Sequence, residues 1–539
     1  MMTYVVRAFV LMNLVSVGLG FCPEPCSCND EVMVVECSQS HLEVLPITLN
    51  PGIQRLQLQF NNIKTVDAAL GFYGQLEFVD LSHNELVSVP DRGFTAQKKL
   101  VELRLADNKV SKISNTTFHG LKSLAILSLR RNFLEELTAN VFVNVANVEE
   151  LDVGQNRIRR IHPEAFAGME QLRVLYIDDN DLKSVPSQAF IPIPHLAELH
   201  LGGNSIEQIQ DKAFDGIVNL YELDLHGASI YNISDKAFSG LETLRVLKLS
   251  ANALDKIPGL QISSLDRLEQ LFLGENFIEA VPDNVFQGLR KLRVLDLSKS
   301  KNLMIIEGLA FSENSNLAWL RLSGCRSVAI ETGALKLATG LRTVHLSDMG
   351  WERVPPDLLA WHNIKVCDLK QNPLTCDCKS KWLRDTLSGL SNNSSGAECY
   401  RPAHLKGRLL AGVPSSSFHC GVLSRQDQAV IAVVCVAAGL ATGLAILVLV
   451  HCRRKVCLPL QQCASPCQQS PSPCTQCHNP CQQYPVQHVS QVMNSDCIQH
   501  AENLYYPSST KSTYCSDDDY FFSLSHDKKT FQPIPVSEL

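Results

Sequence analysis

Two groups of four cysteines are the residues of this chain whose spacing most plainly allows chemistry. The first group is Cys22, Cys26, Cys28 and Cys37, and the second is Cys376, Cys378, Cys399 and Cys420. Thiolates so close in sequence hold zinc in reducing compartments, whereas along the secretory route the same thiols oxidise to disulfides. The compartment in which the chain folds therefore decides between metal sites and disulfides.

Catalytic chemistry finds much less support. His200, Asp224 and Ser250 have the residue types of a Ser–His–Asp triad, but they stand at equivalent places of a repeating pattern that predicts no pocket. The chain contains no G-x-S-x-G, H-E-x-x-H or G-x-x-x-x-G-K-[ST] motif. We therefore expect no enzyme activity, no catalytic metal and no cofactor.

Two apolar segments indicate the cellular compartment of the chain and its orientation in a membrane. Residues 1–20 join Arg7 to an apolar run that ends in Gly18-Leu19-Gly20, which is typical of a secretory signal peptide. Residues 429–450 are uncharged, and as a helix they span about 33 Å, enough to cross a bilayer. Arg453-Arg454-Lys455 follows directly, and such a basic flank stays in the cytoplasm. We predict a single-pass type I protein of the plasma membrane with an extracellular N-terminus, in which disulfides are favoured over zinc.

The overall composition limits the classes of protein to which the chain can belong. Apolar residues make up 45% of the chain and charged residues 19%, which is close to a globular average and excludes wholesale disorder. The formal net charge is −7, so the basic excess of nucleic-acid-binding proteins is missing. We expect no nucleic-acid partner.

A repeat of 23 to 25 residues organises the segment between the signal and the membrane. The pattern L-x-x-L-x-L-x-x-N-x-L occurs fourteen times, beginning at Ile53, Leu76, Leu100, Leu124, Val148, Leu172, Leu196, Leu220, Leu244, Leu268, Leu292, Leu317, Leu341 and Ile364. Its central x-L-x-L-x predicts a short strand with inward leucines, and one unit alone cannot bury them. Neighbouring units must therefore stack into a solenoid with one continuous core.

Two further residue types recur at the same period. Ten of the fourteen repeats have asparagine at the ninth position, where its amide can hydrogen-bond backbone groups of the turn. Phenylalanine precedes most repeat starts by six residues, as Phe118, Phe142 and Phe166 illustrate, which predicts a stacked aromatic spine on the convex side. Cys325 and Cys367 are the two remaining extracellular cysteines; they lie too far apart to pair and are predicted to be buried thiols.

On these residues, the segment 22–420 resembles the extracellular leucine-rich repeat family. The resemblance implies an α/β leucine-rich repeat solenoid, curved, with a parallel β-sheet on its concave face. It also implies an N-terminal cysteine cap at 21–52, repeats at 53–375 and a C-terminal cysteine cap at 376–424. The disulfides that it implies are Cys22–Cys28, Cys26–Cys37, Cys376–Cys399 and Cys378–Cys420.

Four N-glycosylation sequons accompany this architecture, at Asn115, Asn232, Asn392 and Asn393. Asn115 and Asn232 fall late in their repeats, away from the strand that carries the inward leucines. Glycans at these positions would leave the concave face free.

The residues beside the strand leucines form columns across the concave face. Charged side chains stand close to aromatic ones that a merely solvated sheet does not need, which is typical of protein interfaces. We predict that an extracellular protein partner binds this face at Arg104, Arg130, Tyr176, Phe272 and Trp319.

Residues 451–539 are rich in Gln, Ser, Pro and Cys, and they lack apolar periodicity, which predicts a disordered cytoplasmic tail. Cys452 and Cys457 suit palmitoylation next to the membrane. The final Ser537-Glu538-Leu539 resembles a ligand of PDZ domains. Gly439 and Gly443, four residues apart in the apolar helix, allow a lateral dimer.

As a whole, the order of these segments resembles the type I transmembrane leucine-rich repeat adhesion and recognition proteins, either Capricious/Tartan-like or neuronal leucine-rich repeat transmembrane-like. The resemblance implies cell-surface recognition or adhesion. Two alternatives stay open: an organiser that binds extracellular-matrix proteins, and an innate-immune or growth-factor co-receptor.

Overall fold

The computed structural model describes residues 21–66, 68–326, 328–390, 395–418 and 425–456. The predicted signal peptide and nearly all of the predicted tail lie outside the described residues, as do Asn392, Asn393, Cys420, Cys457, Ser537 and Leu539. The chain divides into two units, Met1–Gly421 and Val422–Leu539.

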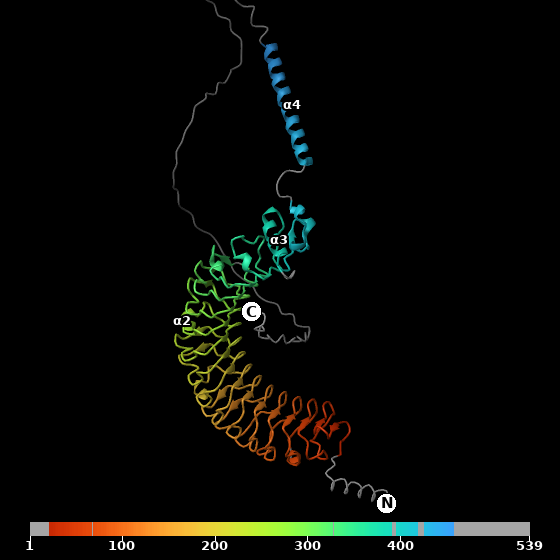
Figure 1. Cartoon of the computed structure of the whole chain (residues 1–539), viewed down its shortest axis with the longest axis vertical. Coiled ribbons are helices and arrows are strands. Elements are labelled where there is room, and N and C mark those ends of the chain that lie inside the picture. The colour runs from red at the N-terminus through yellow and green to blue at the C-terminus, as the bar shows by residue number, and fades with distance from the viewer. Residues whose placement is uncertain (1–20, 67, 327, 391–394, 419–424, 457–539) are drawn as a thin grey trace, which may run out of the picture. The chain divides into compact units, whose positions relative to one another are not determined.

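A sixteen-stranded sheet runs through the first unit (Figure 1). It begins with the antiparallel pair β1 (Ser27–Asn29) and β2 (Val34–Glu36), and every later pairing in it is parallel. Each of the fourteen repeats then contributes one three-residue strand. These strands are β3 (Arg55–Gln57), β4 (Phe78–Asp80), β5 (Glu102–Arg104), β6 (Ile126–Ser128), β8 (Glu150–Asp152), β10 (Val174–Tyr176), β11 (Glu198–His200), β13 (Glu222–Asp224), β15 (Val246–Lys248), β16 (Gln270–Phe272), β18 (Val294–Asp296), β20 (Trp319–Arg321), β22 (Thr343–His345) and β23 (Val366–Asp368).

The repeat pattern produces this sheet by burying one residue type in every strand. In β6 the central Leu127 is fully buried, whereas Ile126 and Ser128 are half-buried on the open face. The register keeps equivalent positions opposite each other, so that Leu127 lies beside Leu103 and Leu151. The leucines therefore form one core, and the predicted leucine-rich repeat solenoid is confirmed.

The asparagines at the ninth position of the repeat join each repeat to the ones beside it. Asn132 Nδ2 donates to the carbonyl oxygens of Leu105 at 2.9 Å and Leu129 at 3.0 Å, and its Oδ1 accepts from Val110 N at 2.9 Å. A buried backbone group without a partner is costly, so these bonds stabilise turns that no strand ladder covers. Where Cys325 replaces asparagine, its Sγ instead lies 3.3 Å from Leu297 O.

The phenylalanines stack behind the sheet at the repeat period. The ring centroids of Phe118 and Phe142 lie 6.2 Å apart, those of Phe142 and Phe166 lie 6.1 Å apart, and all three side chains are buried. In the ninth repeat Ile262 takes the place of phenylalanine, at the end of the short helix α2 (Gly259–Ile262). The spine is therefore interrupted there.

Short strands on the flank of the solenoid form three separate ladders. They are β7 (Glu136–Leu137) with β9 (Arg160–Ile161), β12 (Gln208–Ile209) with β14 (Asn232–Ile233), and β17 (Ala280–Val281) with β19 (Ile305–Ile306) and β21 (Ala329–Ile330). Brief 3-10 turns close other repeats at η1 (Ala68–Phe72), η2 (Ser187–Phe190), η3 (Ala334–Lys336) and η4 (Trp361–Asn363).

Both ends of the solenoid carry disulfides. The N-terminal cap has Cys22–Cys28 and Cys26–Cys37. Near the C-terminal end, β24 (Leu374–Thr375) pairs with β25 (Cys399–Arg401), and the disulfide Cys376–Cys399 joins the residue after β24 to the first residue of β25. Between them lie η5 (Cys378–Ser380) and α3 (Lys381–Ser388). The turns η6 (Ala403–Leu405), η7 (Leu410–Gly412) and η8 (Ser415–Phe418) follow β25. Cys378 is exposed, and Cys420, with which it was expected to pair, is outside the described residues.

The second unit contains the helix α4 (Arg425–Val456). Within it lies the 20-residue stretch Ala432–His451, whose most apolar 18-residue window has a mean hydropathy of 2.7. At about 1.5 Å per residue this stretch measures about 30 Å, the thickness of a hydrocarbon core. It is one candidate membrane span, two residues shorter than the predicted segment 429–450.

Candidate binding face

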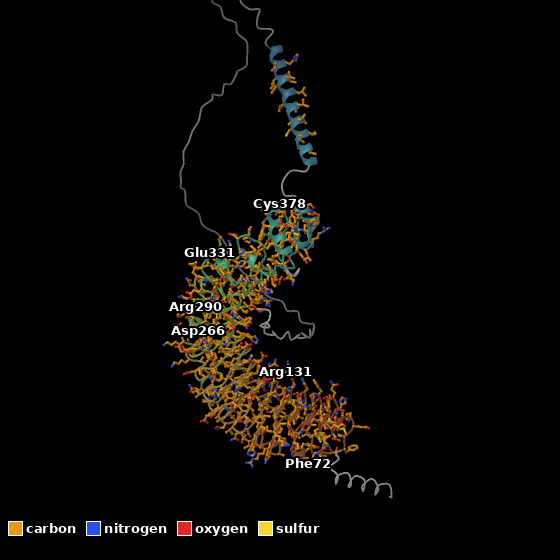
Figure 2. The ribbon with its side chains drawn as sticks, viewed as in Figure 1. Phe72, Arg131, Asp266, Arg290, Glu331 and Cys378 are labelled. Atoms are coloured by element: carbon orange, nitrogen blue, oxygen red, sulfur yellow. A yellow bond between two sulfur atoms is a disulfide. The ribbon has the colours of Figure 1, made fainter. Side chains whose placement is uncertain are left out.

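The face of the sheet opposite the leucine core lines the inner side of the solenoid, and we call it the concave face. Arg131 projects from this side in Figure 2, whereas Asp266 and Arg290 project from the outer side. The concave face consists of the outer residues of each strand and the two residues that follow the next buried leucine. Its side chains are held at fixed spacing because the strands beneath them are in parallel register.

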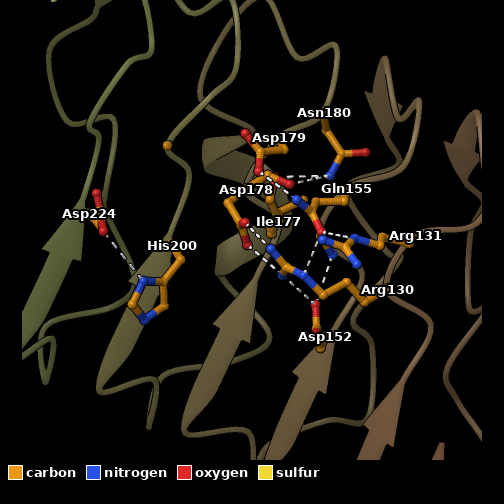
Figure 3. A network of polar contacts seen from close by, with 12 residues as sticks. Arg130, Arg131, Asp152, Gln155, Ile177, Asp178, Asp179, Asn180, His200 and Asp224 are labelled. Carbon is orange, nitrogen blue, oxygen red and sulfur yellow. Dashed lines mark hydrogen bonds and ion pairs between the residues drawn. The ribbon is translucent and has the colours of Figure 1, made fainter. Parts of the chain in front are cut away.

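Arg130 occupies the centre of a three-repeat ion cluster on this face (Figure 3). Its Nη1 lies 3.1 Å from Asp152 Oδ1 and 3.1 Å from Asp178 Oδ1, and its Nη2 lies 2.5 Å from Asp178 Oδ2. The two-pronged contact with Asp178 crosses the repeat that carries Gly154. A Cβ atom at position 154 would lie 2.3 Å from Arg130 Nη1, so glycine is what lets the guanidinium pass.

A glutamine links this cluster to a second arginine. Gln155 Oε1 accepts from Arg130 Nε at 3.0 Å and from Arg131 Nε at 2.6 Å, and its Nε2 donates to Asp179 at 3.2 Å. Arg131 also pairs with Asp107 at 3.3 Å. The network therefore runs over four consecutive repeats, and such shared hydrogen bonds hold each side chain in one rotamer.

Asp224 is the centre of a second cluster, four repeats beyond Arg130. Its carboxylate lies 3.7 Å from His200 Nδ1, 2.9 Å from His226 Nδ1 and 3.4 Å from Lys248 Nζ. Burial opposes ionisation of Asp224, but hydrogen bonds from the two histidines and the charge of Lys248 hold its pKa well below the ordinary value. The cluster therefore carries a fixed negative charge that its cationic neighbours offset.

The same contacts shift the pKa of His200. Burial alone would lower its pKa, but the carboxylates of Asp224 and Glu198 outweigh that effect and raise the pKa to about 9. The hydrogen bond that His226 donates to the Asp224 carboxylate also raises the pKa of His226. His200 is therefore a cation at neutral pH, which is the wrong protonation state for the general base of a triad.

Tyr176 lies between the two clusters. Its ring stacks on His200, with centroids 4.5 Å apart. Burial, followed by the charges of Glu150 and Glu198, raises the pKa of its hydroxyl to about 12. Tyr176 therefore presents a neutral, half-buried phenol to the concave face, fixed by the histidine beneath it.

Carboxylates dominate this central part of the face. Repeats five to eight place seven of them in the strands or just after them: Glu150, Asp152, Asp178, Asp179, Glu198, Glu222 and Asp224. Burial and the neighbouring carboxylates Asp152 and Glu102 raise the pKa of Glu150, so repulsion within the group is appreciable. Arg130 and Lys248 flank it on either side.

The next part of the face toward the C-terminus is aromatic. Phe272 in β16 and Trp319 in β20 are half-buried, and the Trp319 ring lies 5.1 Å from that of His345. Arg321 Nη1 lies 3.7 Å from Asp296 Oδ2. Phe277, just beyond the sheet, leaves 57% of its surface exposed.

The five residues predicted to bind a partner all lie on the concave face, but they form two groups. Arg130 and Tyr176 are two strand steps apart, or about 10 Å, and so are Phe272 and Trp319. Tyr176 and Phe272 are separated by four steps, about 19 Å. Arg104 lies at the edge of the first group, where its guanidinium pairs with Glu102.

Sequence reasoning did not identify the partners of these residues. The spacing of the repeats did not pair Arg130 with Asp152, 3.1 Å away. Asp181, close in sequence to Asp178 and Asp179, instead lies 3.6 Å from Arg159. A signal in the sequence could have revealed the acidic centre. Glutamate recurs two residues after the repeat start, at Glu102, Glu150, Glu198 and Glu222.

The predicted sites outside this face are placed as follows. Asn115 is exposed, and Asn232 is exposed within β14 on the flank. Cys325 and Cys367 are buried free thiols. Cys452 falls within α4. Among the described residues, no group of His, Cys, Asp and Glu side chains could hold a metal ion.

Comparison with known proteins agrees with the repeat architecture of the solenoid. The profile described as "Leucine rich repeat" matches five overlapping segments, residues 74–132, 122–182, 170–228, 218–278 and 266–326. Residues 74–326 are therefore leucine-rich repeats, and the chain carries a leucine-rich repeat solenoid.

Individual relatives share shorter stretches. The chain is 34% identical to human oligodendrocyte-myelin glycoprotein over 82 residues, which cover 15% of this chain and 19% of that protein. It is 30% identical to zebrafish leucine-rich repeat-containing protein 3 over 116 residues, covering 16% of this chain and 44% of the relative. The matches thus span less than half of either relative.

A solved structure shares the fold over a longer distance. The TLR13 chain of a TLR13–ssRNA13 complex aligns with a TM-score of 0.55 at 23% identity, over 68% of this chain and 61% of that chain. This likeness concerns the fold alone.

Proposed function

We propose that the protein is a cell-surface recognition or adhesion receptor whose concave face binds an extracellular protein partner. The observation that carries the proposal is the composition of that face, where Tyr176, Phe272 and Trp319 stand half-exposed among fixed charges. Aromatic anchors surrounded by charge are typical of protein interfaces. Fourteen strands about 4.8 Å apart give a face about 65 Å long, which suits a protein rather than a small molecule.

The proposed orientation is type I in the plasma membrane. A signal peptide at 1–20, the span in α4 and the basic segment after it support this orientation. The relatives that share its repeats include a myelin glycoprotein by name, which is consistent with a glycosylated surface protein.

A glycan placed on the face tests the proposal directly. Lys248→Asn creates the sequon 248–250 with Leu249 and Ser250, and Arg321→Asn does the same with Leu322 and Ser323. The Lys248 glycan would stand between the two groups, one strand step from Phe272 and three steps from Tyr176. The Arg321 glycan would stand in the same strand as Trp319. The matched controls Lys248→Gln and Arg321→Gln remove the same charge without adding a glycan.

The readout is binding of the displayed protein to partner cells, and cell aggregation for homophilic adhesion. We expect at least one glycan to abolish binding while both glutamine variants keep it. If neither glycan, once shown by mass to be attached, weakens binding, the concave site is wrong and a convex or cap site replaces it.

The aromatic anchors are tested separately. Tyr176→Ala and Trp319→Ala should each weaken binding about 10- to 100-fold, as truncation of a central aromatic commonly does. Phe72→Ala is the matched control, since Phe72 is also an aromatic side chain, is 63% exposed and lies in η1, away from the sheet. Surface amounts of all three variants should match that of the unaltered protein.

Two other functions share the same face and differ in the partner. A matrix organiser would bind secreted matrix proteins without aggregating cells, and a co-receptor would require a second receptor on the same cell. The order of segments favours adhesion and recognition. The aggregation assay separates adhesion from the matrix-organiser and co-receptor functions.

The cytoplasmic part of the proposal concerns recruitment. Cys452 and Cys457 would be palmitoylated, Gly439 and Gly443 would support a lateral dimer, and Ser537–Leu539 would bind a PDZ-domain protein. Deleting Ser537–Leu539 should alter clustering at the surface and leave extracellular binding unchanged. Identical clustering without the whole tail would reduce the molecule to a passive anchor.

A further inference from the structure

A hollow of about 420 Å³ opens on the flank of the solenoid between repeats eight and nine. We call it the flank hollow; its lining includes Asp211, Tyr231, Asn232, Asp235, Lys256 and Gln261. This volume lies within the range of about 300–1,000 Å³ that small-ligand sites occupy. The flank hollow is separate from the concave face, because its residues follow the buried asparagine position of each repeat rather than the strand.

The hollow exists because a flank ladder stops there. β14 pairs with β12 on one side, and the next flank ladder begins only at β17, two repeats later. The intervening ninth repeat continues from Lys256 through Pro258 directly into α2. Proline has no N–H to donate to a ladder, and the chain turns away. The edge of β14 that faces repeat nine is therefore open.

One residue on that open edge is a glycosylation sequon. Asn232 is exposed, lines the flank hollow and begins Asn232-Ile233-Ser234. Within the described part of the chain, its side-chain amide makes no hydrogen bond, so its Nδ2 is available to carry a sugar. A glycan attached there starts inside the hollow.

The lining has the chemistry that a sugar requires. Tyr231 is 49% exposed and offers an aromatic surface to the C–H face of a pyranose ring. Asp211 and Asp235 can accept from sugar hydroxyl groups, and Lys256 can donate to them. Leu254 and Pro258 add two apolar side chains to the lining.

The side chains at the rim are already held in place. Gln261 Nε2 donates to Asp235 Oδ1 at 3.1 Å and to Ile233 O at 3.3 Å, so it ties α2 to the open edge of β14. Gln208 Nε2 donates to the hydroxyl oxygen of Tyr231. Asp211 Oδ1 accepts from Lys236 N at 3.0 Å. A ligand entering the hollow therefore has little side-chain ordering left to impose.

From this juxtaposition we propose that the flank hollow seats the first sugar residues of an N-linked glycan carried by Asn232. Weak contacts suffice, because the covalent bond to Asn232 keeps the sugar at a millimolar or higher effective concentration. The seated glycan bridges repeats eight and nine where the flank ladder is missing. The proposal requires the extracellular placement of the solenoid and does not depend on partner binding at the concave face.

The test compares two glycans on the same full-length protein made in secretory cells. Under native conditions, an endoglycosidase that cuts at the asparagine-linked sugar is applied, and release is followed for each glycopeptide by mass. Asn115 is the internal comparator, since it is exposed and does not line the flank hollow. We expect the Asn232 glycan to be released at least about tenfold more slowly, the factor that 1.4 kcal/mol of contact supplies.

Two variants test whether the slower release of the Asn232 glycan depends on the flank hollow. Tyr231→Ala should bring the release rate at Asn232 up toward that at Asn115, whereas Tyr221→Ala, which removes another exposed tyrosine of the same repeat outside the hollow, should not. Only glycosylated molecules are counted, so a change in occupancy near the sequon does not affect the rate. Trimming the glycan should also increase hydrogen exchange in residues 254–261.

The outcomes are separable. Equal release rates at Asn232 and Asn115, or no response to Tyr231→Ala, overturn the seated glycan in favour of one that extends into solvent. An unoccupied Asn232 with an occupied Asn115 also overturns it, while extracellular placement stands. If both asparagines are unoccupied, the extracellular placement under the proposed function fails as well.

Discussion

Arg130 reaches across an entire repeat to Asp178, forty-eight residues further along the chain, and meets both carboxylate oxygens. The contact is possible because the intervening repeat has Gly154 where a side chain would otherwise stand. Arginine and a carboxylate in this two-pronged geometry form one of the stronger polar pairs in proteins. The concave face therefore has a rigid centre before any partner arrives.

Gly154→Ala tests this arrangement. The new methyl group would lie 2.3 Å from Arg130 Nη1 and 2.7 Å from Asp178 Oδ1, so both side chains must move out of their two-pronged geometry. We expect a loss of about 1–3 kcal/mol, measured as a lower thermal midpoint. In an Arg130→Met background the same substitution should cost clearly less; equal costs in both backgrounds would show that the glycine serves another purpose.

Asn132→Ala probes the asparagine ladder. The substitution leaves the carbonyls of Leu105 and Leu129 and the amide of Val110 without their side-chain partner in the core. We predict a loss of about 2–4 kcal/mol from these unsatisfied groups. Asn219→Ala, at an exposed asparagine with one bond to Pro194 O, is the control and should cost less than about 1 kcal/mol. Similar midpoints for both variants would contradict a stabilising ladder.

Stability should fall as pH rises through the range in which His200 titrates. Its pKa in the folded protein is about 9, above the ordinary value near 6.5, so its charged form stabilises the fold fully below pH 6.5. That contribution, about 3 kcal/mol, is lost progressively as pH approaches 9. Thermal midpoints between pH 6 and 9.5 should fall less steeply for His200→Gln than for the unaltered protein. Parallel profiles would rule out His200 as the titrating group, leaving His226.

The cysteines should differ sharply in reactivity. Burial raises the pKa of Cys325 to about 11 and that of Cys367 to about 12, so neither thiol should be alkylated in the native protein at pH 8. Both should react after denaturation without reduction. Peptide mapping under these conditions is also expected to recover a Cys378–Cys420 disulfide, and native alkylation of Cys378 would disprove that pairing.

The repeat itself explains why so much of the architecture was predictable. A period of about 24 residues with leucine at four fixed positions leaves one way to bury those leucines, and Leu103, Leu127 and Leu151 lie side by side as the pattern requires. The roles of Asn132 and Phe142 followed from the same period. Local pattern and core burial point to the same structure throughout this segment.

The concave contacts could not be predicted in the same way. Arg130 had Asp107, Asp152, Asp178 and Asp179 within plausible reach, and sequence spacing does not distinguish between them. The choice depends on where the backbone of three repeats places each side chain and on the room above Gly154. Long side chains on a sheet surface are paired by geometry rather than by pattern.

By itself, the sequence determined the solenoid, its period, its inward leucines and the candidate membrane span, because each depends on apolar residues recurring at intervals that only one backbone geometry buries. The tertiary structure alone decided which charges meet at Asp178 and Asp224, and that the flank ladder stops beside Asn232. Those features depend on contacts between repeats, where distances of a few ångströms separate a salt bridge from an unpaired charge.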